Sequence, residues 1–228
     1  MNIPVIISTE DGSDTLFVPE MNEQYHSIHG AMAESRHIFI NCGFNFFSNH
    51  PVIKVLEIGF GTGLNCLLTA LEATMSNIYT CYYAMENYPL PAELVRRLNY
   101  PVLTGREGSE IFSGIHEAPW DEKIMITPGF ELLKLRDDFT KSSLEEIQGV
   151  EVVYFDAFGP EKQPEMWETE LFRKLNQVMK EGGLLMTFSA KGSVRRSLQA
   201  AGFEVERLPG PSGKREILRA FKMKVLLN

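Results

Sequence analysis

Residues 55–63 read VLEIGFGTG, an apolar run that ends in an acid and then in three glycines within five positions. The run predicts a buried strand, and Gly59, Gly61 and Gly63 predict a tight bend after it. Glycines there permit positive φ and allow backbone N–H groups to approach a ligand. We therefore expect a ligand-binding loop at residues 59–63; a plain strand-to-helix turn is the alternative interpretation.

Strands and helices alternate around this bend. Helical spacing predicts a helix from Leu64 and further helices over residues 91–98, 164–180 and 192–202. Runs rich in apolar or β-branched residues predict seven strands, at residues 52–58, 79–86, 123–127, 150–158, 183–190, 203–208 and 216–221. This alternation is typical of an α/β fold, in which helices cover both faces of a mostly parallel sheet. The segment PGPSGK predicts a hairpin that makes the last strand antiparallel.

The composition favours one main domain. The chain has 228 residues, of which 44% are hydrophobic, enough for a single substantial core. We expect residues 1–50 to be an N-terminal extension packed on the sheet and residues 51–228 to form the domain itself. The sequence shows neither a long apolar span nor a signal peptide, so we expect a cytoplasmic protein without membrane contact.

The cysteines and the charge pattern bear on partners. Cys42, Cys66 and Cys81 are far apart and lack zinc-site spacing, so we expect buried thiols and no metal. The formal net charge is −8, yet the chain from Lys191 onward has nine basic and three acidic residues. A basic C-terminal part on an acidic body is compatible with a polyanion such as a nucleic acid, and equally with a solvated surface.

The glycine loop does not match the common phosphate-binding patterns. A Walker loop needs a Lys followed by Ser or Thr, and a dinucleotide fingerprint needs a glycine where Leu64 stands. Glu57 precedes the loop, and Glu86 ends the next predicted strand. Glu86 is suited to ribose hydroxyls, whereas Glu57 would repel a pyrophosphate and attract a cation. The pattern favours a cationic nucleoside, although either acid alone is also compatible with a solvated strand end.

A second group of candidate residues follows the predicted strand at 150–158. Asp156 comes where that strand opens into a loop, and a carboxylate there can orient a ligand amine and accept a proton. The alternative is a structural Asp that caps the amides of its own loop. For Phe158 and Trp167, stacking on a base and filling the core are both open interpretations.

Five motifs in order along residues 20–221 resemble the methyltransferase half of the MnmC family. They read VLEIGFGTGLNCLL, AMENYPL, YFDAFGPEKQPEMW, TFSAKGSVRRSLQAAGF and GKREIL. The N-terminal segment YHSIHGAMAESRHIFI is similar to that family as well. The resemblance implies a class I, Rossmann-like methyltransferase fold. No segment resembles the family's flavin-dependent oxidase domain, so the resemblance implies a stand-alone form.

The resemblance also implies a cofactor and its site. S-adenosylmethionine is expected to bind at Glu57, Gly59, Phe60, Gly61, Thr62, Gly63, Asn65, Glu86 and Asp156. Glu86 would hold the ribose, and Asp156 would face both the transferred methyl group and the substrate amine as the catalytic residue. The family usually has an acid after the third strand, near the adenine. This sequence reads ITPGFELL there, which leaves only Glu131 as a doubtful substitute.

The implied reaction is N-methylation of 5-aminomethyl(-2-thio)uridine at the wobble position of tRNA. The anticodon loop is the expected partner, with Phe158 receiving the splayed base. The candidate phosphate contacts are Lys191, Arg195, Arg196, Lys214 and Arg215. A class I methyltransferase of a small molecule or protein and a non-catalytic tRNA-binding module remain as alternatives. The sequence does not define the oligomeric state.

Overall fold

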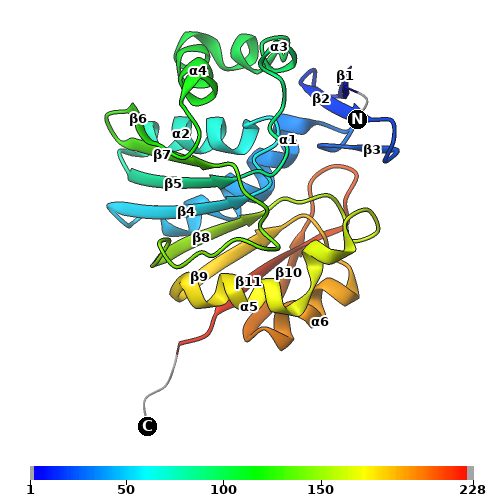
Figure 1. The fold of residues 1–228 in the computed structure, drawn as a ribbon, viewed down its shortest axis with the longest axis vertical. Helices are drawn as coiled ribbons and strands as arrows, with labels where there is room; N and C mark the ends of the chain where they lie inside the picture. Colours follow the sequence, from blue (N-terminus) through cyan, green and yellow to red (C-terminus); the bar gives the residue numbers. More distant parts are fainter. Residues whose placement is uncertain (1–2, 225–228) are drawn as a thin grey trace.

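A computed structural model describes residues 3–224, so residues 1–2 and 225–228 of the two expected regions lie outside it. Its centre is an eight-stranded sheet of order β10-β11-β9-β8-β4-β5-β7-β6, shown in Figure 1. The strands are β4 (Val52–Ile58), β5 (Tyr79–Met85), β6 (Lys123–Thr127), β7 (Phe130–Leu135), β8 (Val150–Phe155), β9 (Met179–Thr187), β10 (Phe203–Pro209) and β11 (Glu216–Lys222). The strands β7, β5, β4, β8 and β9 pair in parallel, and β11 pairs antiparallel with both neighbours. The expected α/β class and antiparallel last strand are confirmed.

The strand count differs because β7 was not predicted. Pro128 and Gly129 suggest a loop in the sequence, but they form the tight connection of a hairpin between β6 and β7. The strand at residues 123–127 is therefore an antiparallel edge strand, half-buried rather than buried. The third parallel strand next to β5 is β7.

Helices cover both faces of the sheet. In Figure 1, α2 (Leu64–Ser76) and α4 (Tyr100–Glu117) lie on one side, and α5 (Thr169–Val178) and α6 (Gly192–Ala200) lie on the other. The short α3 (Ala92–Val95) begins after Pro91, as expected. The sequence did not predict α4, whose glycines disfavour a helix and include Gly105 with φ of 73°.

The predicted helix at residues 164–180 is shorter than expected. A 3-10 turn, Pro164–Trp167, precedes α5, and α5 ends at Val178 because Met179 already pairs with β8. Gly182 and Gly183 lie within β9 rather than after a helix. The pairing of β8 with β9 shifts register in this region.

The period of two along each strand divides the core between the faces. In β8, Val152 and Tyr154 belong to the core on the α2 side, whereas Val153 and Phe155 belong to the core on the α5 side. Asp156 follows with the same parity as Tyr154, and it therefore points toward α2. Glu57 of β4 reaches the same side, because its neighbour Val55 packs in the α2-side core.

The N-terminal region packs on the α2 side of the sheet. It contains a small antiparallel sheet that was not predicted, and Figure 1 shows it beside α1. A π-helical turn brings Phe39 against Tyr154, with ring centroids 5.0 Å apart. The elements are β1 (Val5–Ser8), β2 (Asp14–Val18), β3 (Glu23–Gln24), α1 (Ala31–Ser35), the π-turn (Arg36–Asn41) and a 3-10 turn (Phe44–Phe47).

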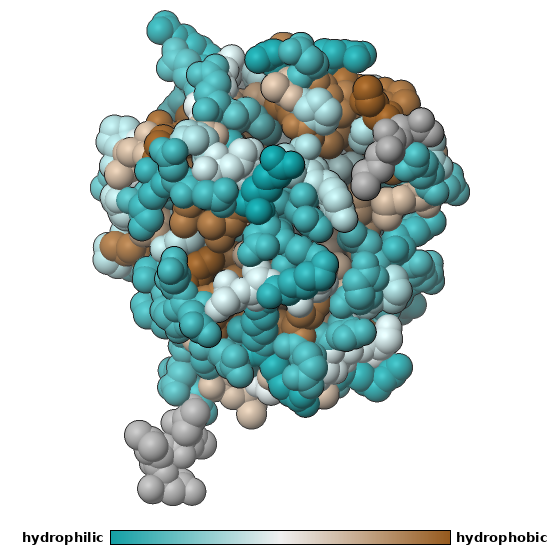
Figure 2. Space-filling model, in the orientation of Figure 1, coloured by the Kyte–Doolittle hydropathy of each residue, from teal (hydrophilic) through white to brown (hydrophobic). Residues whose placement is uncertain are grey.

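Hydrophilic side chains predominate on the face seen in Figure 2, and hydrophobic surface is gathered in separate patches. Within residues 3–224, no helix is both long and apolar enough to cross a bilayer. The same residues contain no group of three or more His, Cys, Asp or Glu side chains arranged to hold a metal ion.

Candidate active site

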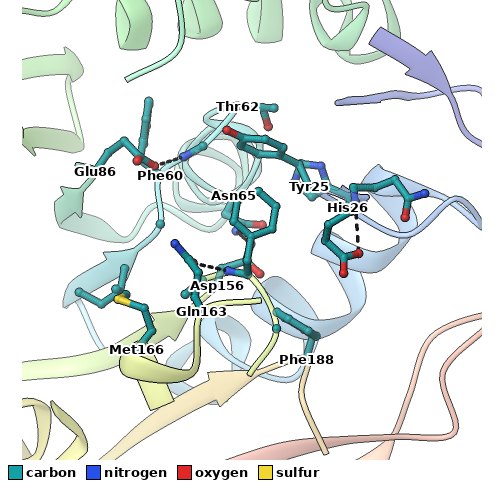
Figure 3. Close-up of a pocket in the computed structure, with 18 of the residues that line it drawn as sticks. Tyr25, His26, Phe60, Thr62, Asn65, Glu86, Asp156, Gln163, Met166 and Phe188 are labelled. Atoms are coloured by element: carbon teal, nitrogen blue, oxygen red, sulfur yellow. Dashed lines mark hydrogen bonds between the residues drawn. The ribbon is translucent and has the colours of Figure 1, made fainter. Parts of the chain in front are cut away.

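The carboxyl ends of β4, β5 and β8 open onto a cleft of about 720 Å³. This is the edge at which parallel α/β sheets place their ligands. Figure 3 shows Asn65, Glu86, Asp156 and Phe188 around the cavity, with Tyr25 from the N-terminal region facing them. Segments from distant parts of the chain therefore form one site.

The glycine loop has the strained backbone that its sequence predicts. Gly59, Gly61 and Gly63 have φ values of 93°, 50° and 75°. At Gly59 an added Cβ would lie 2.6 Å from the backbone oxygen of Asp156, so only glycine fits between β4 and β8. The Gly61 N–H donates to the Glu86 carboxylate at 3.0 Å, which fixes the loop over the end of β5.

Asn65 connects two buried carboxyl groups. Its Nδ2 donates to Glu57 Oε1 at 3.0 Å and to Asp156 Oδ2 at 2.8 Å. Tyr82 donates its hydroxyl to Glu57 Oε2 at 2.9 Å. Glu57 is fully buried and does not line the cleft, so it acts on the cleft through Asn65 rather than by the expected direct contact. Asn65 Oδ1 is buried and has no hydrogen-bond partner within the described chain.

Burial changes the acidity of both carboxyl groups. It raises the pKa of Glu57 well above its ordinary value, against the opposing hydrogen bonds from Tyr82 and Asn65. It raises the pKa of Asp156 to about 7, against the hydrogen bond from Asn65. Asp156 can therefore exchange a proton near neutral pH, as a proton acceptor in this cleft requires.

Glu86 lies half-buried at the end of β5, where the sequence places it. Its Oε2 accepts from Gly61 N at 3.0 Å, and its Oε1 accepts from Tyr88 N at 2.9 Å. Each carboxylate oxygen has a further lone pair, so Glu86 can still accept hydrogen bonds from a ligand.

The other predicted loop residues are placed differently. The Phe60 ring packs against His116 and Trp120, with centroids 5.6 and 5.9 Å away. Thr62 lines the cleft but is buried, and its carbonyl accepts from His116 Nε2 at 3.1 Å. Phe60 and Thr62 thus line the cleft and also pack against residues behind the loop, whereas Gly63 lies outside the cleft wall.

The two aromatic candidates after β8 have different positions. Phe158 lines the cleft and meets the Tyr25 ring edge-on, with centroids 5.1 Å apart. Trp167 is 4% exposed and donates its indole N–H to Phe158 O. Of the two interpretations of Trp167, the structure confirms the core position.

The acid expected near the adenine was sought at the wrong position, because strand β7 was not predicted. Glu131 lies within β7 and pairs with Lys123 at 3.2 Å, so it is not part of the cleft. The residues that follow the third parallel strand are Asp137 and Asp138, and both line the cleft. Asp138 is already paired with Lys141 at 2.8 Å. Asp137 is therefore the better candidate.

The sequence did not predict the contribution of the N-terminal region. Tyr25, His26 and Glu34 line the cleft opposite the glycine loop and the end of β8. Burial lowers the pKa of His26 to about 4, which keeps its ring neutral. Glu34 is 6% exposed, and its Oε1 lies 2.7 Å from Lys214 Nζ. The segment YHSIHGAMAESRHIFI contains these residues, but no local pattern in it predicts a cleft wall.

The five predicted basic residues do not form one surface. Lys214 was expected to contact a phosphate, but it lines the cleft and is paired with Glu34. Lys191 pairs with Glu161 at 2.5 Å. The remaining three are outside the cleft wall: Arg196 and Arg215 are exposed, and Arg195 is half-buried with an Nε that lacks a partner within the described chain.

Comparison with known proteins shows what this chain is similar to. A family model described as S-adenosyl-L-methionine-dependent methyltransferase matches residues 131–223. The solved structure of MnmC2 from Aquifex aeolicus superposes with a TM-score of 0.80 at 27% identity, covering 99% of this chain and 72% of that one. Residues 131–223 thus match the S-adenosyl-L-methionine-dependent methyltransferase family, and the chain as a whole is similar to MnmC2.

Two curated relatives of this family are bifunctional proteins for tRNA 5-methylaminomethyl-2-thiouridine biosynthesis, both named MnmC. The protein of Pseudomonas syringae is 32% identical and covers 88% of this chain. The protein of Cupriavidus metallidurans is 29% identical and covers 92% of it. The chain spans about a third of the length of these relatives, 32% and 33% respectively.

The cofactor of this MnmC-like methyltransferase is S-adenosylmethionine, and the cleft fits it. Asn65 Oδ1 is an unused buried acceptor of the kind that an aminoacyl ammonium group needs. Glu57, Asp156 and Glu86 place carboxyl groups at or behind the cleft wall, which favours a cationic ligand.

Proposed function

We propose that the protein methylates the primary amine of 5-aminomethyl(-2-thio)uridine at the wobble position of tRNA. The observation that carries this proposal is Asp156, which Asn65 holds at 2.8 Å in the cleft and whose pKa is raised to about 7 by burial. The MnmC relatives support the choice of substrate, because their names specify biosynthesis of 5-methylaminomethyl-2-thiouridine, the methylated product of the proposed reaction. A tRNA substrate implies that the protein works in the cytoplasm.

Different cleft residues bind different parts of the cofactor. Glu86 holds the ribose, Asn65 Oδ1 accepts from the aminoacyl ammonium group, and Asp137 faces the adenine. The glycine loop supplies close backbone approach at residues 59–63. The bound cofactor supplies a methyl group on a cationic sulfur.

Asp156 then serves the acceptor amine. An alkylamine with a reference pKa of about 10.4 is mostly protonated at neutral pH, so it must lose a proton to become a nucleophile. We assign that proton to Asp156. The free amine nitrogen would then form its bond to the methyl carbon as the methyl–sulfur bond breaks, and the bonding pair would stay on sulfur as a neutral thioether. Correct placement of the two reactants contributes up to about 7–11 kcal/mol in favourable cases.

The N-terminal region completes this site in our proposal. Residues 51–228 form the methyltransferase domain, and residues 1–50 are an extension that supplies Tyr25, His26 and Glu34 to the acceptor side. Phe158 stacks on the splayed uracil. Lys191, Arg195, Arg196 and Arg215 contact phosphates of the anticodon loop.

The direct test is mass spectrometry of wobble nucleosides after incubation with S-adenosylmethionine and undermodified tRNA. We expect a gain of one methyl group on the 5-aminomethyl nitrogen, and loss of that gain in Asp156→Asn. Methyl transfer to a metabolite or protein but not to this tRNA would establish the first alternative. Binding of tRNA without binding of S-adenosylmethionine would establish a non-catalytic module.

A further inference from the structure

The acceptor side of the cleft contains an ion pair that the proposed chemistry has not used. Lys214 lies at the end of the connection between β10 and β11, and its side chain is only 27% exposed. Its Nζ is 2.7 Å from Glu34 Oε1 and 4.3 Å from the centroid of the Phe188 ring. In Figure 3, His26 and Phe188 lie across the cavity from Glu86, on this acceptor side.

The hairpin is held against the N-terminal region, so Lys214 has a fixed place. His37 Nε2 donates to Pro209 O at 2.9 Å. At Gly213 an added Cβ would fall 2.0 Å from the His29 ring, which shows how closely the hairpin tip approaches residues 27–30. Glu34 is itself fixed, because its Oε2 accepts from Ser27 N at 2.7 Å.

The charges that face this pair come from several elements. Asp156 follows β8, and both Glu34 and Lys214 act electrostatically on its carboxyl group: Glu34 raises the pKa of Asp156 and Lys214 lowers it. The neutral His26 lies between β3 and α1, and Asp11 also acts on it. Beyond these residues, His29 pairs with Glu10 at 3.0 Å, and Arg215 is exposed next to Lys214.

A fixed ammonium group at this place has a direct chemical effect on an amine substrate. A like charge nearby disfavours the protonated form of an amine, and it also favours the ionised form of a neighbouring carboxyl group. The positive charge of Lys214 therefore favours the deprotonated form of both partners in the proton transfer, the substrate amine and Asp156. Glu34 opposes that effect and fixes the position of the charge.

We propose that the Glu34–Lys214 pair is a positioning device that selects the neutral form of the acceptor amine beside Asp156. The proposal rests on the proposed function, since it concerns an amine acceptor in the same cleft. It assigns Lys214 to the protonation state of the substrate and not to a tRNA phosphate.

The test is the pH dependence of single-turnover methyl transfer to undermodified tRNA at saturating S-adenosylmethionine. In Lys214→Met we expect the acid limb of the pH–rate profile to move to higher pH by about one unit. The reason is that both the substrate amine and Asp156 hold their protons more tightly without the nearby positive charge. Lys214→Arg retains the charge and the wild-type profile. Glu34→Gln moves the limb to lower pH. Arg207→Met is the matched control, because Arg207 is a cation on the same hairpin that pairs with Glu216 outside the cleft, and its loss leaves the profile unshifted.

The outcomes separate this inference from the proposed function. A wild-type protein that methylates tRNA, with Lys214→Met slower but unshifted in pH, overturns the pair's role and leaves the function intact. A wild-type protein that methylates no tRNA overturns the function. The pair is then judged by titrating Asp156 through its ¹³C-labelled carboxyl group: opposite shifts in Lys214→Met and Glu34→Gln support it, and unmoved values overturn it.

Discussion

Asn65 shows how one side chain can organise a site. Both of its amide hydrogens are used on carboxyl groups, Glu57 at 3.0 Å and Asp156 at 2.8 Å, which leaves its oxygen free for a ligand. A leucine or alanine at this position would leave two buried acids without a shared donor. Leaving such a buried group without its hydrogen bond typically costs about 1–3 kcal/mol.

The raised pKa of Asp156 predicts a stability effect with a definite sign. Burial raises this pKa from 3.8 to about 7, so the unfolded state loses this proton first, and the destabilisation grows as pH rises from 3.8 to about 7 and is constant above pH 7. Asp156→Asn should therefore melt at a higher temperature than wild type at pH 8.5, with the difference shrinking toward pH 5. Thermal unfolding by circular dichroism across this range is the measurement. A difference independent of pH would contradict the assignment.

At the scale of elements, the β4–loop–α2 unit was predictable because its signals are local. An apolar run, three glycines and a helical stripe lie within 25 residues, Val52 to Ser76. The strand β7 was missed because Pro128–Gly129 suggests a loop, and α4 was missed because glycines interrupt it. Because β7 was not predicted, Asp137, which follows it, was not recognised as a cleft residue either.

The glycine loop gives a prediction with a matched control. Gly59 and Gly12 both have positive φ, 93° and 82°, but a Cβ at Gly59 meets Asp156 O at 2.6 Å while one at Gly12 meets nothing within 4 Å. Gly12→Ala should cost about 1–2 kcal/mol of stability from backbone strain alone. Gly59→Ala should cost more and weaken S-adenosylmethionine binding as well. Urea unfolding and calorimetry compare the two; equal costs with unchanged binding would contradict this account of the loop.

At the scale of the whole molecule, the cofactor half of the cleft was predictable and the acceptor half was not. The residues proposed for the cofactor are either consecutive in the sequence or lie at the ends of strands, so local patterns predict them. The acceptor half joins Tyr25 and Glu34 to Lys214, residues nearly 200 positions apart, through packing of the N-terminal region on the hairpin. No local pattern predicts that contact, so Lys214 was assigned to a tRNA phosphate.

The charge distribution predicts how tRNA binding responds to salt. The chain carries a formal charge of −8, with its basic excess after residue 190, where Arg196 and Arg215 are exposed. If each contacts one phosphate, Arg196→Ala plus Arg215→Ala should lower the slope of log K against log salt by about 1.5. Arg106→Ala is the control, because Arg106 is exposed on α4 and pairs with Glu110. An unchanged slope in the double variant would remove both residues from the interface.

The central claim is that buried carboxyl groups held by Asn65 make the cleft selective for a cationic methyl donor. A bound cation favours the ionised forms of Glu57 and Asp156, so binding should release protons near pH 7. Calorimetry in buffers of different ionisation enthalpy counts those protons for S-adenosylmethionine and for S-adenosylhomocysteine, whose sulfur is neutral. We predict that the sulfonium compound releases more protons and that its affinity rises more steeply with pH. Equal proton release by both compounds would contradict the claim.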